Sequence, residues 1–410
     1  MNTSATSALP ATSEGAATAG TTSTPVVKKS RGEAFLRRVA RKLQSALIIT
    51  FVTMGLLVSI ETVLRVVFHY PRGYFRFMAA DGTRLYPAST TLSMRWGAIP
   101  YEVKTNALGF RGDEIDRVAP PGRQRIVAIG DSVTDGFFVD DEATFPAQLQ
   151  RYLRVAGRDV EVINAARGGG SIDKEYAILK EHGFPLQPDI VVLTFVTNDI
   201  FDIRERSLES LLTRDLHAPS QSLGGRLLTE TALGEWVTDR ALRLRFQSYR
   251  AADRPTESSV ATAKDPRYEL WGADHFDENV QRFRALTGKM DGMILNEPFS
   301  DEVKGIFGNY VAILDRMKRD CSERNARLVF VYFPAYSQVY DPEASLTIRD
   351  LLAAECAARS IDFVDLTGPF RSEGRTTVLH LAPVDFHPNP GGNRLMARTV
   401  GARLTTPSGG

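Results

Sequence analysis

The sequence predicts an α/β fold in which helices cover both faces of a parallel sheet. Short apolar runs rich in Val and Ile recur from residue 124 onward, a pattern typical of strands buried on both faces. Amphipathic stretches of helical length separate these runs. The chain has 410 residues, of which 43% are hydrophobic and 24% charged, which suffices for one large domain with a sizeable core.

The first segment, residues 1–42, is predicted to be a disordered, basic tail. Residues 1–30 are rich in Ala, Thr, Ser and Gly and contain almost no large apolar side chains. Burial therefore cannot offset the entropy lost when this segment becomes ordered. The tail contains seven basic residues, which are Lys28, Lys29, Arg31, Arg37, Arg38, Arg41 and Lys42.

Residues 43–68 are predicted to form a single transmembrane anchor. The segment from Ala46 to Ile60 carries no charge, and its extension to Phe68 is long enough to span a bilayer. Glu61 and Arg65 interrupt the span, but they lie four residues apart on one helical face and can pair. A buried core helix and a cleaved signal peptide are the alternatives. The long segment before the span and the lack of a small-x-small cleavage site after it favour an anchor.

The charges around the span predict its orientation. Seven Lys and Arg residues precede the span, against only two acidic residues, Glu14 and Glu33. By the positive-inside rule, the tail is cytoplasmic and everything beyond about residue 70 lies outside the cytoplasm. In a bacterium, that location is the periplasm or the cell surface.

The remaining chain is divided into a lead-in segment, residues 69–120, and a main domain, residues 121–410. The lead-in is predicted to be irregular or β-rich and to pack on the main domain. The predicted strands of the main domain span residues 125–130, 159–165, 189–196, 327–333 and 361–366. The predicted helices span residues 142–156, 173–183, 303–325, 344–359 and 391–404.

The alternation of strands and helices breaks between about residues 200 and 302. This stretch mixes large apolar residues with several arginines and is predicted to be a mostly helical insertion. It is either a structural cap with a solvated arginine face or a lid over the substrate. Cys321 and Cys356 lie in predicted helices and are expected to be buried free thiols, with a single disulfide in an oxidising compartment as the alternative.

Polar residues follow the first three predicted strands at the point where each strand ends. Ser132 follows the first strand, the run Gly168 to Gly170 follows the second, and Asn198 follows the third. The carboxyl ends of parallel strands meet at one edge of a sheet, so these residues are expected to converge. Near the C-terminus, Asp385 and His387 directly precede the last predicted helix.

Together these residues supply what acyl transfer requires. A serine hydroxyl is a weak nucleophile that needs an adjacent base, which His387 provides for Ser132. Asp385 is the nearest carboxylate that can orient His387. The backbone N–H groups of Ser132 and Gly169 and the side-chain amide of Asn198 are the candidate donors to the oxyanion. His380 is interpreted as structural, with a place in the lining of the site as the alternative.

In this order, the motifs resemble the SGNH, or GDSL-type, hydrolase superfamily. The resemblance covers residues 124–200 and 305–404 and begins with Gly130-Asp131-Ser132-Val133. It implies a flavodoxin-like three-layer α/β/α sandwich with a five-stranded parallel sheet, Ser132 as the nucleophile and Ser132, Gly169 and Asn198 as the oxyanion donors.

The chain departs from the superfamily pattern at two positions. The usual Gly-x-Asn-Asp is Val196-Thr197-Asn198-Asp199 here, and the usual Asp-x-x-His is shortened to Asp385-Phe386-His387. The lead-in sequence Asn106-Ala-Leu-Gly-Phe-Arg-Gly112 resembles a segment upstream of membrane-anchored bacterial members of the superfamily.

The favoured hypothesis is a serine ester hydrolase that acts outside the cytoplasm on an acylated glycan, a lipid or a small acyl ester. An O-acyltransferase that modifies an envelope or exported polysaccharide is the alternative, because the acyl-enzyme can also pass its acyl group to a sugar hydroxyl. The second alternative is a non-catalytic envelope or glycan-binding protein on the same scaffold. No cofactor or metal site is predicted, and a net charge of +1 gives no reason to expect nucleic acid as a partner.

Overall fold

The structure is a computed structural model that describes residues 31–67, 85–96, 99–203, 207–213, 231–234, 236–237, 240, 299–341, 343–381 and 387–406. The predicted tail up to residue 30 and most of the predicted insertion lie outside the described residues. The chain divides into two units, Met1–Ile60 and Glu61–Gly410.

Helix α1 (Arg31–Val66) contains the predicted membrane span. It begins within the predicted tail, because the basic stretch before the span consists largely of residues with good helix propensity. Its apolar side chains are exposed, as in Leu47 (70%) and Phe51 (81%), instead of being packed in a core. By length and composition, Phe35–Val66 could cross a membrane. The Arg65 guanidinium pairs with the Glu61 carboxylate at 2.5 Å, as their spacing predicts.

The lead-in contains an antiparallel hairpin of two strands, β1 (Thr91–Trp96) and β2 (Ile99–Lys104). After this hairpin, the chain forms a bridge between Thr105 and Arg111 and a further antiparallel bridge between Arg111 and Asn164. Asn164 is the last residue of β4 in the main sheet. The lead-in is therefore joined to the edge of the main sheet.

The main sheet has five parallel strands in the order β4-β3-β5-β6-β7, which confirms the predicted fold class. The strands are β3 (Gln124–Ile129), β4 (Val160–Asn164), β5 (Ile190–Phe195), β6 (Arg327–Tyr332) and β7 (Asp362–Asp365). Their ends differ from the predicted ones by at most one residue. The strand order reverses between β3 and β5, which is where ligands bind in open parallel sheets.

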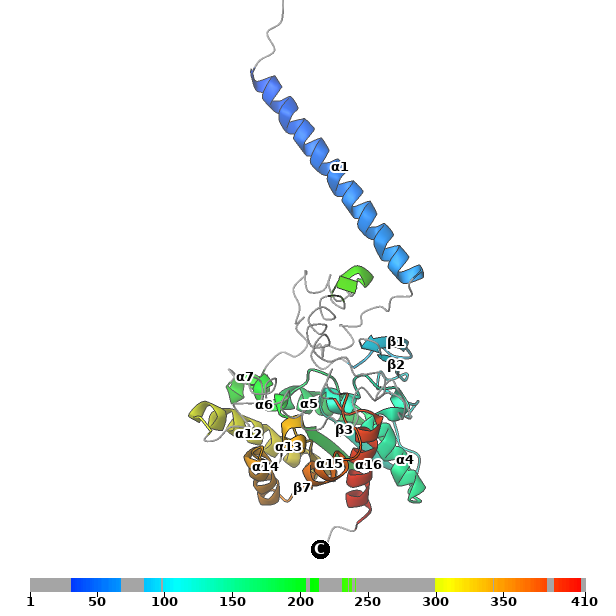
Figure 1. Ribbon diagram of the computed structural model, residues 1–410, viewed down its shortest axis with the longest axis vertical. Coiled ribbons are helices and arrows are strands. Elements are labelled where there is room, and N and C mark those ends of the chain that lie inside the picture. The colour runs from blue at the N-terminus through cyan, green and yellow to red at the C-terminus, as the bar shows by residue number, and fades with distance from the viewer. Residues whose placement is uncertain are drawn as a thin grey trace, which may run out of the picture. The chain divides into compact units, whose positions relative to one another are not determined.

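Helices cover both faces of this sheet because alternate residues of each strand point to opposite faces. In β5, Val191, Leu193 and Phe195 pack with α5, α12 and α14 on one face. Ile190 and Val192 pack with α4 and α16 on the other face, where α4 and α16 lie side by side (Figure 1). These helices are α4 (Phe145–Val155), α5 (Ile172–Ile178), α12 (Asp301–Glu323), α14 (Thr347–Ala358) and α16 (Pro390–Thr405).

Several short helices were not expected from the sequence, because one or two turns leave too few residues for a periodic pattern. They are α3 (Ser132–Asp135), α6 (Asn198–Asp202), α13 (Tyr336–Tyr340) and α15 (Thr367–Glu373), whereas α7 (Leu208–Thr213) lies within the predicted helical insertion. Short 3₁₀ turns occupy Asp141–Ala143 and Phe184–Leu186, and a π-helical turn, Leu179–Gly183, follows α5. The main surprise is α3, since the sequence predicts only a turn after the first strand.

Cys321 in α12 and Cys356 in α14 are buried, free thiols in one core cluster, as expected. Burial raises the pKa of each thiol to about 12. Both thiols are therefore protonated at neutral pH and shielded from reagents.

We predict that a disulfide-exchange reagent such as Ellman's reagent does not label the native, detergent-solubilised chain at pH 8. After unfolding in guanidinium chloride without reductant, both cysteines, Cys321 and Cys356, are expected to react. Rapid labelling of the native protein, or no labelling of the unfolded protein, would contradict the buried, free state.

Candidate active site

Ser132 is the first residue of α3, directly after the carboxyl end of β3. Gly130 makes the connection with a φ of +153°, and a Cβ there would lie 2.5 Å from Thr134 Oγ1, so only glycine fits. The Asp131 carboxylate caps α3 by accepting the Val133 N–H at 3.0 Å. The short strand, the glycine and the capping aspartate thus fix the direction of the Ser132 side chain.

His387 lies next to this serine, with its Nε2 atom 2.7 Å from Ser132 Oγ. In the tautomer with an unprotonated Nε2, the Ser132 hydroxyl donates a hydrogen bond directly to the imidazole. That is the geometry a general base needs to activate a serine nucleophile. The structure therefore brings together the predicted nucleophile and the predicted base.

The backbone around His387 is held against the segment that precedes it. The Leu381 N–H donates to His387 O at 2.9 Å, and the Asn389 N–H donates to Leu379 O at 3.0 Å. The Asn389 side chain caps α16 by accepting the Gly392 N–H at 3.0 Å. His387 is thus fixed between a short β-bridge and the first turn of a long helix.

Asn198, the first residue of α6, also reaches the nucleophile turn. Its Nδ2 atom donates to Asp131 Oδ2 at 3.0 Å, and the same oxygen lies 3.1 Å from Ser132 Oγ. Val196 stands where the superfamily has a glycine, but it does not adopt a positive φ. A side chain is therefore tolerated at that position, and Asn198 keeps its place beside Ser132.

The glycine run after β4 passes next to the same turn, since a Cβ on Gly170 would lie 3.9 Å from Asp131 Cα. The Gly168 N–H donates to Asp135 Oδ2 at 2.9 Å, and the Phe137 ring occupies the space that a Gly168 side chain would need. Gly169 has a φ of +70°, and its N–H makes no hydrogen bond with another residue of the described ranges. Of these two glycines, Gly169 is thus the one whose N–H is available to a ligand.

The predicted acid, Asp385, lies outside the described residues, so its role stays a prediction. Within the described ranges, no group of His, Cys, Asp and Glu side chains could hold a metal ion. The arrangement that the structure does describe is that of a serine, its base and two neighbouring loops that carry hydrogen-bond donors.

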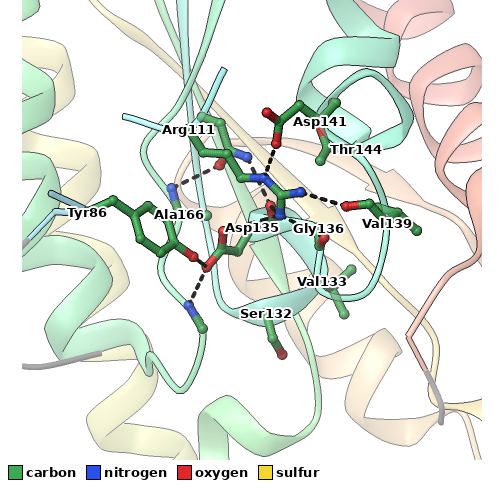
Figure 2. A network of polar contacts seen from close by, with 12 residues as sticks. Tyr86, Arg111, Ser132, Val133, Asp135, Gly136, Val139, Asp141, Thr144 and Ala166 are labelled. Carbon is green, nitrogen blue, oxygen red and sulfur yellow. Dashed lines mark hydrogen bonds and ion pairs between the residues drawn. The ribbon is translucent and has the colours of Figure 1, made fainter. Parts of the chain in front are cut away.

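A buried network that the sequence did not reveal lies behind the nucleophile (Figure 2). It joins Asp135 of α3 to Tyr86 and Arg111 of the lead-in. The motif Asn106–Gly112, which contains Arg111, was the only sequence signal that pointed to this segment. Nothing in that signal indicated a contact with the nucleophile helix.

His380 lies buried beside the site and packs among aromatic rings, with ring centroids 5.1 Å from Tyr336 and 5.6 Å from Phe370. Its Nδ1 atom lies 3.1 Å from the Tyr340 hydroxyl. Burial, with a smaller contribution from His387, lowers the pKa of His380 to about 3. It is therefore neutral over the physiological pH range, which agrees with a structural role.

The model of the GDSL-like lipase/acylhydrolase family matches residues 128–395 of this chain. No curated protein sequence matches this chain. Similar solved structures include the acetyl xylan esterase AlAXEase, with 14% identity, coverage of 68% of this chain and 99% of that chain, and a TM-score of 0.37. A putative lipolytic protein of the G-D-S-L family from Desulfitobacterium hafniense has 11% identity, coverage of 68% and 98%, and a TM-score of 0.36. A catalytic mutant of an acetylxylan esterase from Geobacillus stearothermophilus has 14% identity, coverage of 69% and 94%, and a TM-score of 0.37.

The burial of His380 predicts a specific loss of stability in acid. The folded pKa of about 3 lies below the ordinary value of 6.5, so the unfolded chain binds a proton that the folded chain does not. The contribution of His380 to the free energy of unfolding is therefore fully present above pH 6.5. It is lost as the pH falls from 6.5 towards 3, by up to about 1.4 kcal/mol per pH unit.

His380→Phe keeps an aromatic ring at this position but cannot titrate. Between pH 6.5 and 4.5, the free energy of unfolding of the wild type should fall more steeply than that of the variant, measured by urea denaturation. Parallel pH profiles for the two proteins would contradict the account of His380.

Proposed function

This chain belongs to the GDSL-like lipase/acylhydrolase family, whose members hydrolyse ester bonds, and we propose on that basis that Ser132 is its catalytic nucleophile. The observation that carries the proposal is the 2.7 Å distance between Ser132 Oγ and His387 Nε2. A serine hydroxyl in direct contact with a histidine base is the arrangement that covalent ester cleavage by a serine requires.

In the proposed reaction, Ser132 Oγ attacks the ester carbonyl carbon while His387 Nε2 takes the hydroxyl proton. The tetrahedral intermediate collapses when His387 returns that proton to the departing alkoxide, which leaves an acyl group on Ser132. Water then attacks the acyl-enzyme while His387 takes its proton, and His387 returns that proton to Ser132 Oγ as the carboxylic acid leaves. Asp385 is proposed to orient the imidazole and to stabilise its protonated form.

The oxyanion of the tetrahedral intermediate is proposed to bind the N–H groups of Ser132 and Gly169 and the amide of Asn198. The Asn198 amide has two N–H bonds, of which one donates to Asp131. That bond fixes the amide beside the nucleophile and leaves the second N–H for the ligand. Preformed donors of this kind stabilise the charge that develops in the transition state.

We further propose that α1 is a membrane anchor and that the catalytic domain lies outside the cytoplasm. The exposed apolar side chains of α1 and the basic residues before the span support this proposal. The substrates proposed for such an enzyme are acylated glycans, lipids or small acyl esters present at that side of the membrane.

A fluorophosphonate probe tests the nucleophile. The wild-type chain is expected to take up the label, and Ser132→Ala is expected to abolish it because the attacking oxygen is gone. The same substitution should lower kcat for p-nitrophenyl acetate by about 10⁴-fold or more. If the folded wild type takes up no label that Ser132→Ala removes, the proposed function is wrong.

The anchor is tested by washing membranes that contain the full chain. We expect the protein to stay in the membrane fraction in 1 M salt and in alkaline carbonate, because about twenty apolar residues insert into the bilayer core. A variant that lacks residues 31–67 serves as the control and should be released. Recovery of the full chain in the salt wash, or of a chain whose N-terminus begins after residue 68, would contradict an uncleaved anchor.

A further inference from the structure

We propose that the lead-in segment positions the catalytic site through Arg111 and Tyr86, which hold Asp135 and the loop that follows it. Asp135 and Arg111 would then be positioning residues for the Gly168–Gly169 loop and for His387. This inference rests on the proposed function, and it explains why a segment outside the family match contacts the nucleophile helix.

Asp135 connects the nucleophile helix to the glycine loop. It is the last residue of α3, three positions after Ser132, and its side chain is fully buried. Its Oδ2 atom accepts the Tyr86 hydroxyl at 2.6 Å and the Gly168 N–H at 2.9 Å. Since the adjacent peptide carries the Gly169 N–H, one carboxylate oxygen sets the place of this proposed oxyanion donor relative to Ser132.

Arg111 clamps the backbone from Asp135 to Val139 (Figure 2). Its Nη1 atom donates to Asp135 O at 2.9 Å and to Gly136 O at 2.8 Å, and its Nη2 atom donates to Val139 O at 2.6 Å. Its Nε atom donates to Asp141 Oδ1 at 2.6 Å. The guanidinium is buried, so each of these bonds lies in a low-dielectric environment where its loss is costly.

The clamped segment carries two phenylalanines that contact His387. The Phe137 and Phe138 ring centroids lie 5.6 Å and 5.1 Å from the centroid of the imidazole. Phe138 has a φ of +67°, which is unfavourable for a bulky side chain and persists only where its surroundings enforce it. Arg111 bonds the carbonyls on both sides of this pair, so the clamp that fixes the strained residue also fixes the rings against the base.

Two guanidinium groups, those of Arg167 and Arg111, lie near the buried Asp135 carboxyl. Burial raises the pKa of the Asp135 carboxyl, and the nearby Arg167 and Arg111 guanidiniums oppose that effect. The Arg167 guanidinium also lies 3.6 Å from the centroid of the Tyr86 ring. Tyr86 is therefore held between the arginine of the glycine loop and the carboxylate that it bonds.

The chain offers a matched control for Arg111. Arg125 is also buried and also bonds one carboxylate, Glu161, and three backbone carbonyls, those of Asp116, Arg117 and Leu186. It lies near the amino end of β3, at the end of the strand opposite to Ser132. Replacing either arginine with lysine removes a guanidinium that donates several hydrogen bonds at once. Only Arg111 adjoins the site.

The experiment compares Arg111→Lys with Arg125→Lys in the detergent-solubilised full chain, with p-nitrophenyl acetate as the substrate. Both variants should lower Tm. Only Arg111→Lys should lower kcat, by about 10- to 100-fold with KM changed by less than about twofold, because the misplaced groups act in the transition state. Asp135→Ala should show the same loss of kcat, and Asp135→Asn, which keeps an oxygen for Tyr86 and Gly168, should recover part of it.

Equal effects of the two arginine variants on kcat, or a folded Arg111→Lys with wild-type kcat, would overturn the inference. If Arg111→Lys does not fold, Tyr86→Phe decides the matter, since it removes one bond to Asp135 and should lower kcat without changing KM. A wild type that takes up no fluorophosphonate label shows instead that the proposed function itself has failed.

Discussion

The hydrogen bond between Ser132 and His387 joins two residues that are 255 positions apart in the chain, and it depends on the assembly of the whole domain. Ser132 is placed by the end of β3, which lies between β4 and β5 in the sheet. His387 is placed by the cap of α16, a helix that packs beside α4 on one face of that sheet. Neither residue has a local reason to meet the other, so the site forms only when the sheet and its helices are complete.

The sequence predicted those parts of the fold that repeat a pattern over several residues. Strands β3, β5 and β6 are buried along nearly their whole length, so each stood out as a continuous apolar run with recognisable ends. The long helices were predicted because their amphipathic pattern also repeats over several turns. Ser132, Asn198 and the glycine run were located because each directly follows a strand, and parallel order brings strand ends together.

The parts that could not be predicted depend on contacts between distant segments. Arg111 and Tyr86 precede the first strand of the main sheet, and Asp135 looked like a polar residue of a turn. Their bonds depend on the contact of the lead-in with the edge strand β4. The backbone of Val196 is a second example, since the missing glycine was a departure from the superfamily pattern that only the observed φ could resolve.

The central claim is that Ser132, His387 and the two neighbouring loops form one acyl-transfer site, and a crystal structure of the chain inactivated by a fluorophosphonate tests it most directly. The account predicts phosphorus bonded to Ser132 Oγ and a phosphoryl oxygen within hydrogen-bonding distance of the N–H groups of Ser132 and Gly169 and the amide of Asn198. An adduct on another residue, or a phosphoryl oxygen that points away from Gly169 and Asn198, would contradict it.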